Sequence, residues 1–141
     1  MTIQVEPSTG IPVADYNFMV ANINQELTRL GLEMLRGLNL AGAADVRGAL
    51  AIVDNTLTKY RNLGQEYRTA QIPVEFVEIS PLLTESLSAS VATAEGTLAG
   101  LREQNEQRVR DSSVHSQRAH DCHVRFMKGL SSIDEAYLAG C

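Results

Sequence analysis

The stretches VANINQELTRLGLEM (residues 20–34) and VRGALAIVDNTLTKY (residues 46–60) decide how this chain folds. In both, apolar residues alternate at spacings of three and four, which places them on one stripe of an α-helix. The stripes consist of Val20, Ile23, Leu27, Leu30 and Met34 in the first stretch, and of Val46, Leu50, Val53, Leu57 and Tyr60 in the second. A stripe of this width is buried most readily against another helix with the same pattern. The spacing therefore predicts helices that pack on one another.

The composition favours one helical domain. A chain of 141 residues can bury about two thirds of its unfolded surface without disulfides or metals. Only 5% of its residues are aromatic, and the apolar residues are mostly Leu, Ala, Val and Ile, which suits a thin aliphatic seam between helices. The net charge of −5 argues against nucleic acid as a partner, because nucleic-acid affinity depends on Lys and Arg.

The lengths of the apolar runs and the first residues of the sequence indicate where in the cell the protein is expected. Every purely apolar run is far shorter than the roughly 20 residues that cross a bilayer, so we expect no membrane span. The sequence MTIQVEPSTGIPVADYN has neither a basic start nor an apolar stretch, and so does not resemble a secretory signal. We therefore expect a cytoplasmic protein, with leaderless export as the alternative that leaves no such trace.

The chain divides into an arm and a domain. Residues 1–13 contain three Pro or Gly residues and no periodicity, and predict an extended or mobile N-terminal arm. Residues 14–141 predict a single helical-bundle domain of all-α class, an antiparallel four-helix bundle. The expected helices cover 15–40, 45–70, 81–109 and 113–139. The alternative is a three-helix arrangement in which residues 81–139 form one long C-terminal helix.

The expected helix boundaries rest on local signals. Asp15 and Asp45 are potential caps for the first two helices, and Ser80-Pro81 is a start signal for the third. Between the second and third helices, residues 73–80 (PVEFVEIS) predict either a short strand or an apolar connector. The sequence Asp-Ser-Ser at 111–113 predicts the turn into the last helix.

The third expected helix is unusually rich in small residues. Between Ser86 and Gly100, eleven of fifteen residues are Ser, Ala, Thr or Gly, and Gly96 and Gly100 lie one turn apart. Small residues let helix backbones approach closely. We interpret the segment as a site of tight packing inside the bundle. The alternative is a subunit interface, for which Gly96 and Gly100 are the candidate interaction residues.

Residues 108–128 (RVRDSSVHSQRAHDCHVRFMK) carry the polar chemistry of the chain. They contain all three histidines and five basic residues, for a charge of +3, whereas residues 73–106 carry six glutamates and one arginine. We expect the two segments to lie against each other, within one hairpin or between subunits. The alternative is a basic patch for an acidic partner or a phosphate ligand. The candidate interaction residues of this segment are Arg108, Arg110, His115, Arg118, Arg125 and Lys128.

Polar residues also occupy apolar stripe positions near the expected turn. Asn105 continues the stripe of the third helix, and Ser112 and His115 continue that of the fourth. We expect the three to form a polar layer at one bundle end, which would fix the helix register. The competing hypothesis is a pH switch based on His115, since imidazole titrates near neutrality. Cys122 lies on the core stripe and is expected to be an inert buried thiol.

No metal centre, cofactor or catalytic site is predicted. His120 and His123 lie one turn apart and are the candidate metal ligands, but structural zinc needs four ligands and catalytic zinc three. The spacing offers neither a phosphate-binding loop nor a nucleophile-base pair. We therefore expect no enzyme.

The pattern as a whole favours a non-enzymatic helical bundle that acts through protein-protein packing. It would be a self-associating structural subunit, a homo-oligomer, or an adaptor for another protein. The alternative is a ligand- or pH-responsive helical bundle that uses the His/Arg-rich segment 108–128.

Overall fold

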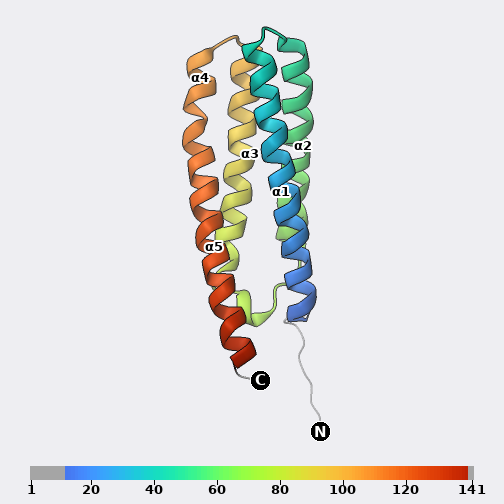
Figure 1. Ribbon diagram of the computed structural model, residues 1–141, viewed down its shortest axis with the longest axis vertical. Coiled ribbons are helices and arrows are strands. Elements are labelled where there is room, and N and C mark those ends of the chain that lie inside the picture. The colour runs from blue at the N-terminus through green and yellow to red at the C-terminus, as the bar shows by residue number, and fades with distance from the viewer. Residues whose placement is uncertain (1–11, 140–141) are drawn as a thin grey trace.

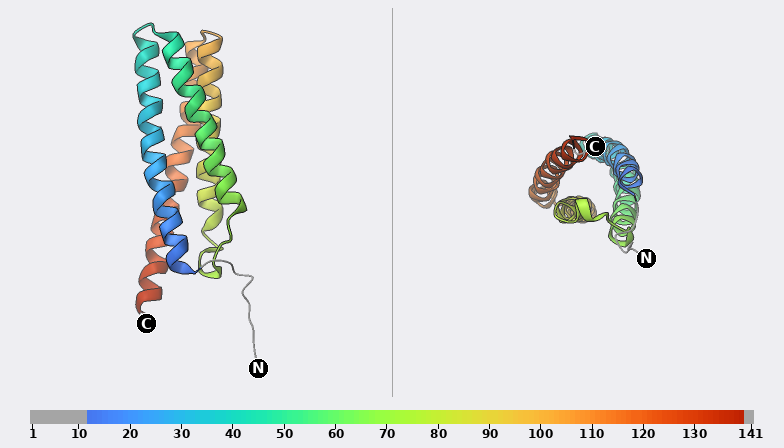
Figure 2. Two further views of the ribbon diagram at one scale, coloured as in Figure 1. Left: turned by 90° about the vertical axis from the view of Figure 1, so that its right-hand side faces the viewer. Right: turned by 90° about the horizontal axis from the view of Figure 1, so that it is seen from below.

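The chain forms an all-α antiparallel four-helix bundle, as the sequence predicts (Figure 1). The computed structural model describes residues 12–139, with side chains as far as residue 133. Four long helices run the length of the bundle, and a short helix and a 3-10 turn lie in the connections. The elements are α1 (Val13–Gly42), α2 (Val46–Thr69), η2 (Val74–Phe76), α3 (Ser80–Arg102), α4 (Glu106–Asp111) and α5 (Ser113–Ala139). Seen from below in Figure 2, the helices follow one another around a common axis in the order α1, α2, α3 and α5.

The apolar stripes of residues 20–34 and 46–60 form half of the core. Val20, Ile23 and Leu30 of α1 and Val53 and Leu57 of α2 are buried in one apolar cluster. The other half comes from α3 and α5, through Leu83, Leu87, Ala94, Leu98, Phe126 and Leu130. Burial of aliphatic side chains stabilises the fold by roughly 25 cal/mol per Å² of apolar surface removed from water. The three-four spacing thus predicts correctly which side of each helix faces inward.

Helix starts follow the predicted caps in one case and depart from them in another. The Asp45 carboxylate accepts a hydrogen bond from the Gly48 N–H at 2.9 Å and caps α2, as predicted. The expected start at Asp15 is two residues late, because α1 begins at Val13 directly after Pro12. The remainder of the predicted arm, residues 1–11, lies outside the described residues.

The connector after α2 closes one end of the bundle. Its central part is the 3-10 turn η2, and residues 73–80 form no strand, so the apolar-connector alternative is correct. Phe76 is fully buried, and its ring stacks on Tyr16 with centroids 4.5 Å apart. Hydroxyl groups form a chain beside this stack, from Tyr16 to Tyr67 at 2.5 Å and from Tyr67 to Ser80 at 2.9 Å. Ser80 therefore starts α3 with its hydroxyl bonded to Tyr67 instead of capping the helix.

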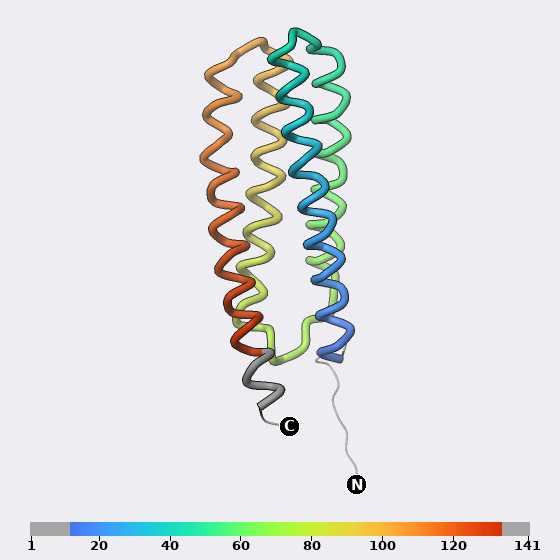
Figure 3. Tube along the Cα trace, in the orientation of Figure 1, coloured from blue at the N-terminus to red at the C-terminus, as the bar shows by residue number. Residues whose placement is uncertain are grey.

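The last turn lies earlier than predicted. Helix α3 ends at Arg102, and the chain reverses over residues 103–105 (Figure 3). Gln104 has a φ of 52°, and the Asn105 side chain accepts a hydrogen bond from the Arg108 N–H at 3.1 Å. Asn105 is thus the N-cap of α4. The predicted turn at residues 111–113 is wrong, because Ser112 only joins α4 to α5, and the single-rod alternative for residues 81–139 is wrong as well.

Candidate functional site

The glycines of the small-residue segment are used for packing within the chain. A Cβ atom on Gly96 would lie 2.9 Å from the Ser112 Cβ, and one on Gly100 would lie 2.9 Å from the Val109 backbone nitrogen. Only glycine lets α3 approach α4 and the start of α5 this closely. The structure therefore agrees with the interpretation of tight packing inside the bundle, and a role of Gly96 and Gly100 in a subunit interface stays a prediction.

A pair of hydroxyl groups replaces the predicted polar layer. The buried Ser112 donates to the Val109 carbonyl at 2.6 Å, and its oxygen lies 3.1 Å from the Thr97 hydroxyl. Asn105 is engaged as the cap of α4, and His115 is exposed. The expected layer of Asn105, Ser112 and His115 is therefore wrong. His115 is not buried, so the hypothesis of a pH switch on a buried His115 loses its premise too.

Ion pairs join the two oppositely charged segments within one chain. Arg118 of α5 contacts Glu85 of α3 at 2.5 Å, and Arg108 contacts Glu103 across the turn at 2.6 Å. Arg110 pairs with Glu106 inside α4. All these side chains are largely exposed, and such pairs contribute about 0–1 kcal/mol each. The within-hairpin alternative for the two segments is thus correct.

Three further residues of segment 108–128 lie outside these pairs. Arg125 and Lys128 are exposed on α5, and no ion pair joins them to another described residue. Cys122 is only half-buried. The expectation of a fully buried thiol is therefore wrong, although its free state agrees with the sequence analysis. The interaction roles of the two basic residues remain predictions.

His120 and His123 both line a pocket of about 290 Å³ on the side of the bundle where α5 meets α1. We call it the seam pocket. All four long helices contribute to its wall, which consists of Asn24, Leu27, Thr28, Gly31, Tyr60, Ser86, Ser90, Ala119, His120 and His123. Small-molecule sites in helical bundles form between facing helices in this way. The seam pocket is the candidate functional site of the chain.

Asn24 holds α5 against α1 at the seam pocket. Its side-chain oxygen lies 2.8 Å from the His123 Nε2, and its amide nitrogen donates to the Met127 Sδ at 3.3 Å. With the amide in this orientation, the oxygen can only accept, so the neutral imidazole carries its proton on Nε2. The histidine spacing predicts that His120 and His123 share a face. It gives no indication of Asn24, which belongs to a helix about a hundred residues earlier.

The pKa of His123 is lowered, first by burial and then by the nearby His120. In the unfolded chain an imidazole titrates near 6.5, so below that pH the unfolded state binds more protons and folding loses stability. We expect the free energy of unfolding to fall between about pH 7 and pH 5, and this fall to be reduced in His123→Gln. Urea unfolding at several pH values measures the effect.

The control for this prediction is His115→Gln, which removes an exposed imidazole from the same helix. It should keep the pH dependence of the unmodified protein. A pH profile that is identical in His123→Gln and the unmodified protein would show that His123 does not carry the effect.

The described residues hold no group of three or more His, Cys, Asp or Glu side chains placed to bind a metal ion. The two imidazoles of the seam pocket therefore lack a carboxylate or thiolate from another helix to complete a zinc site. Both histidines reach one pocket, and this is the only ground on which His120 and His123 stay candidate metal ligands.

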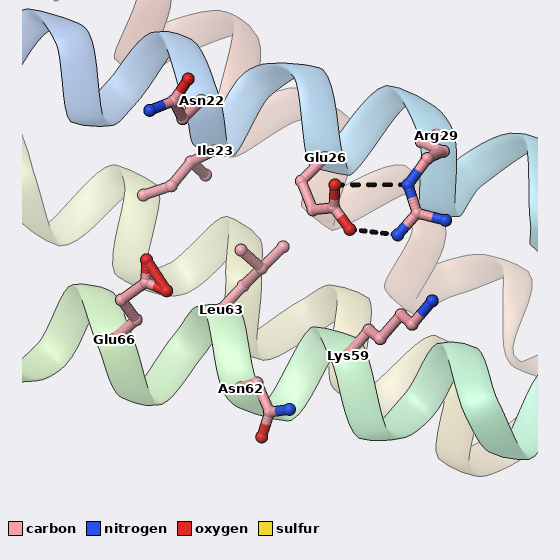
Figure 4. A pocket seen from close by; sticks show the side chains of 8 residues that line it. All are labelled: Asn22, Ile23, Glu26, Arg29, Lys59, Asn62, Leu63 and Glu66. Carbon is pink, nitrogen blue, oxygen red and sulfur yellow. Dashed lines mark hydrogen bonds and ion pairs between the residues drawn. The ribbon is translucent and has the colours of Figure 1, made fainter.

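A second, larger hollow of about 470 Å³ lies between α1 and α2 (Figure 4). Ile23 and Leu63 lie in its wall with charged residues around them. Glu26 and Arg29 bind each other in an ion pair that lowers the pKa of Glu26, and Lys59 and Glu66 add one charge of each sign. The charges of this groove therefore balance. The groove has no net charge that would favour a positively or a negatively charged ligand.

Comparison with known proteins gives no indication of function, so function is inferred from the fold and from the surfaces described above. No family model matches this chain, and no curated protein or solved structure is significantly similar to it. None of the described helices is both long enough and apolar enough to cross a membrane. The class that the described residues define is an antiparallel four-helix bundle with a polar pocket at one helix seam.

Proposed function

We propose that this chain is a non-enzymatic, self-associating structural subunit that packs through the outer face of α1. The observation that carries the proposal is the exposure of large apolar side chains on that helix. Phe18 is 69% exposed, Leu32 64%, Leu35 54% and Leu38 37%. Isolated exposed apolar residues are ordinary, but several on one helix are typical of an interaction surface.

The geometry of α1 makes a contiguous patch from three of these residues. Leu32, Leu35 and Leu38 follow one another at spacings of three, which brings their side chains into neighbouring positions on the helix surface. We call these three residues the α1 patch. Full burial of each leucine contributes about 1.5–3 kcal/mol relative to exposure, so the patch can supply much of the free energy of a small interface.

The charges beside the α1 patch favour a second copy as its partner. Arg29 binds Glu26 and Arg36 binds Glu33, so the charged side chains along this part of α1 are paired with opposite charges on the same helix. Two copies of this face can therefore approach each other without repulsion between like-charged patches, although each chain carries a net charge of −5. A strongly charged partner would gain nothing from this surface.

Light scattering coupled to size-exclusion chromatography tests the proposal. We expect the unmodified protein to have a mass above that of the 15.4 kDa chain, rising with concentration. The double variant Leu32→Glu/Leu35→Glu should be monomeric, because association would bury two unpaired carboxylates.

The matched control is Val114→Glu, which places the same charge on an exposed apolar site of α5. It should associate as the unmodified protein does. A monomer at every concentration would overturn the proposal, and equal loss of association in the control and the double variant would place the interface elsewhere.

A further inference from the structure

The seam between α1 and α5 is the least closed of the four between the long helices. Helix α1 packs along α2, α2 along α3 and α3 along α5, whereas α1 makes no comparable backbone contact with α5. The side chain of Asn24 spans this seam by hydrogen bonds to His123 and Met127. A closed four-helix bundle buries the seams between all its neighbouring helices. Part of the inner surface of this bundle is therefore left uncovered between α1 and α5.

The burial of individual residues shows where this seam is open. Every residue of α5 from 113 to 118 is exposed, including His115, which lies on the same stripe as the half-buried Ala119 and the buried Phe126. On α1, Gly31 is exposed as well, and a Cβ built on it would have no atom outside its own helix backbone within 4 Å. A helix of a closed bundle buries one stripe along its whole length. The inner side of α5 is therefore open to solvent over residues 113–118.

The seam pocket is one end of this opening. Gly31 lines the pocket from α1, and His120 lines it from α5. Leu35 lies one helical turn after Gly31 on the same side of α1, and Ser116 lies one turn before His120 on the same side of α5. We call the continuation of the pocket between Leu35 and Ser116 the open seam. The α1 patch borders it directly, because Leu35 belongs to both.

Both walls of the open seam are free of charged side chains. Charged residues make up 21% of the chain, but neither of these two helix sides contains Asp, Glu, Lys or Arg. Arg118 of α5 is turned away, toward Glu85 of α3. A strongly charged partner would find no opposite charge here, whereas an uncharged apolar helix would lose none of its solvation to an unpaired charge. The residues of the two sides are Asn24, Thr28, Gly31, Leu35 and Leu38 on α1, and Ser113, Ser116, Gln117, His120 and Met127 on α5.

Helix α1 of a second copy has the properties that the open seam requires. Its patch is apolar and exposed, and the residues beside the patch on the same side, Thr28 and Asn39, are uncharged. In an interface with two-fold symmetry every contact occurs twice, so a chain that fills the open seam of its partner has its own open seam filled in return. One pair of helices would thus cover both openings.

We propose that the open seam receives the α1 patch of a second copy of this chain. Leu32 and Leu35 of one copy then lie against both α1 and residues 113–117 of α5 in the other. This inference rests on the proposed self-association through α1, and it adds α5 as the second wall of that interface.

Crosslinking between unlike copies tests the contact with α5. In a Cys122→Ser/Cys141→Ser background, Leu35→Cys is mixed with Gln117→Cys and treated with a short bismaleimide, and peptide mass spectrometry identifies the linked residues. We expect covalent dimers that join positions 35 and 117. The matched control replaces Gln117→Cys by Arg118→Cys, one residue further along α5 but directed toward α3. It should give at most about a tenth of that product, because adjacent helix positions face about 100° apart.

A variant of the α5 wall gives a second, independent measurement. Ser116→Glu/Gln117→Glu should weaken association at least about tenfold in light scattering, because the interface would bury unpaired carboxylates. Both positions are exposed in the single chain, and circular dichroism with thermal unfolding checks that the variant is folded.

The outcomes separate this inference from the proposed function. If Leu32→Glu/Leu35→Glu is monomeric while the α5 variant associates normally, self-association through α1 stands and the open seam is not part of it. Absence of the 35–117 crosslink, or equal crosslinking at position 118, overturns the inference in the same way. A protein that is monomeric at every concentration overturns both proposals, and leaves the open seam to a helix of another protein.

Discussion

Phe76→Ala is expected to lower the free energy of unfolding by about 3–5 kcal/mol, which is a large part of the stability of a small domain. The ring is fully buried and stacks on Tyr16 at the end of the bundle. Its removal leaves a cavity under η2 and takes the packing from one side of the Tyr16 ring. Urea unfolding followed by far-UV circular dichroism measures the loss.

The connector offers its own control for this prediction. Val77 directly follows Phe76 but is largely exposed, so Val77→Ala should change the free energy of unfolding by less than about 0.5 kcal/mol. A loss of similar size in both variants would mean that general loosening of the connector, and not the Phe76 cavity, destabilises the bundle. A small loss in Phe76→Ala would show that the connector does not close the core.

The helices and their inward faces could be predicted because periodic apolar spacing is a local property. The stripe through Val20, Ile23 and Leu30 specifies one side of a helix whatever lies opposite, and each of the three is buried. The cap at Asp45 is equally local, since its carboxylate reaches an N–H three residues further on. Such signals require no knowledge of the tertiary structure.

The predicted turn after α3 is misplaced because Asn105 and the sequence Asp-Ser-Ser at 111–113 both consist of residues that favour helix starts. The hydroxyl of Ser112 caps no helix, since it binds the Val109 carbonyl and lies beside Thr97. Asn105 is the cap that is used, and Gln104 adopts a left-handed backbone conformation that is uncommon outside glycine. Contacts with α3 determine which of the two positions becomes the turn. The local spacing of residues in the sequence does not predict these contacts.

The seam pocket could be predicted only in part for a related reason. Helical spacing brings His120 and His123 to one face, but Asn24 and Tyr60 join them from other helices. Tyr60 continues an apolar stripe, so the sequence assigns it to the core, and its hydroxyl is overlooked. Which polar groups line the pocket beside the histidines depends on how α1 and α2 are placed relative to α5, which packs mainly on α3.

Gly100→Ala is expected to lower the free energy of unfolding by about 1–3 kcal/mol through overpacking. The added Cβ would lie 2.6 Å from a methyl group of Val109, 2.9 Å from its backbone nitrogen and 3.1 Å from the Asn105 carbonyl oxygen. Two of these atoms are backbone, so α4 itself must move away from α3. Alanine is the better helix former by about 1 kcal/mol, and the clash must exceed that gain. Urea unfolding measures the net change.

The same substitution at Gly64 in α2 should have the opposite sign. No atom outside its own helix backbone lies within 4 Å of a Cβ built there, so Gly64→Ala keeps the gain in helix propensity and should stabilise by up to about 1 kcal/mol. Because the chemical change is identical, a difference in sign between the two variants isolates the close approach of α3 and α4. If Gly100→Ala also stabilises, the approach is not tight. The small-residue segment would then be free to serve as a surface for a partner.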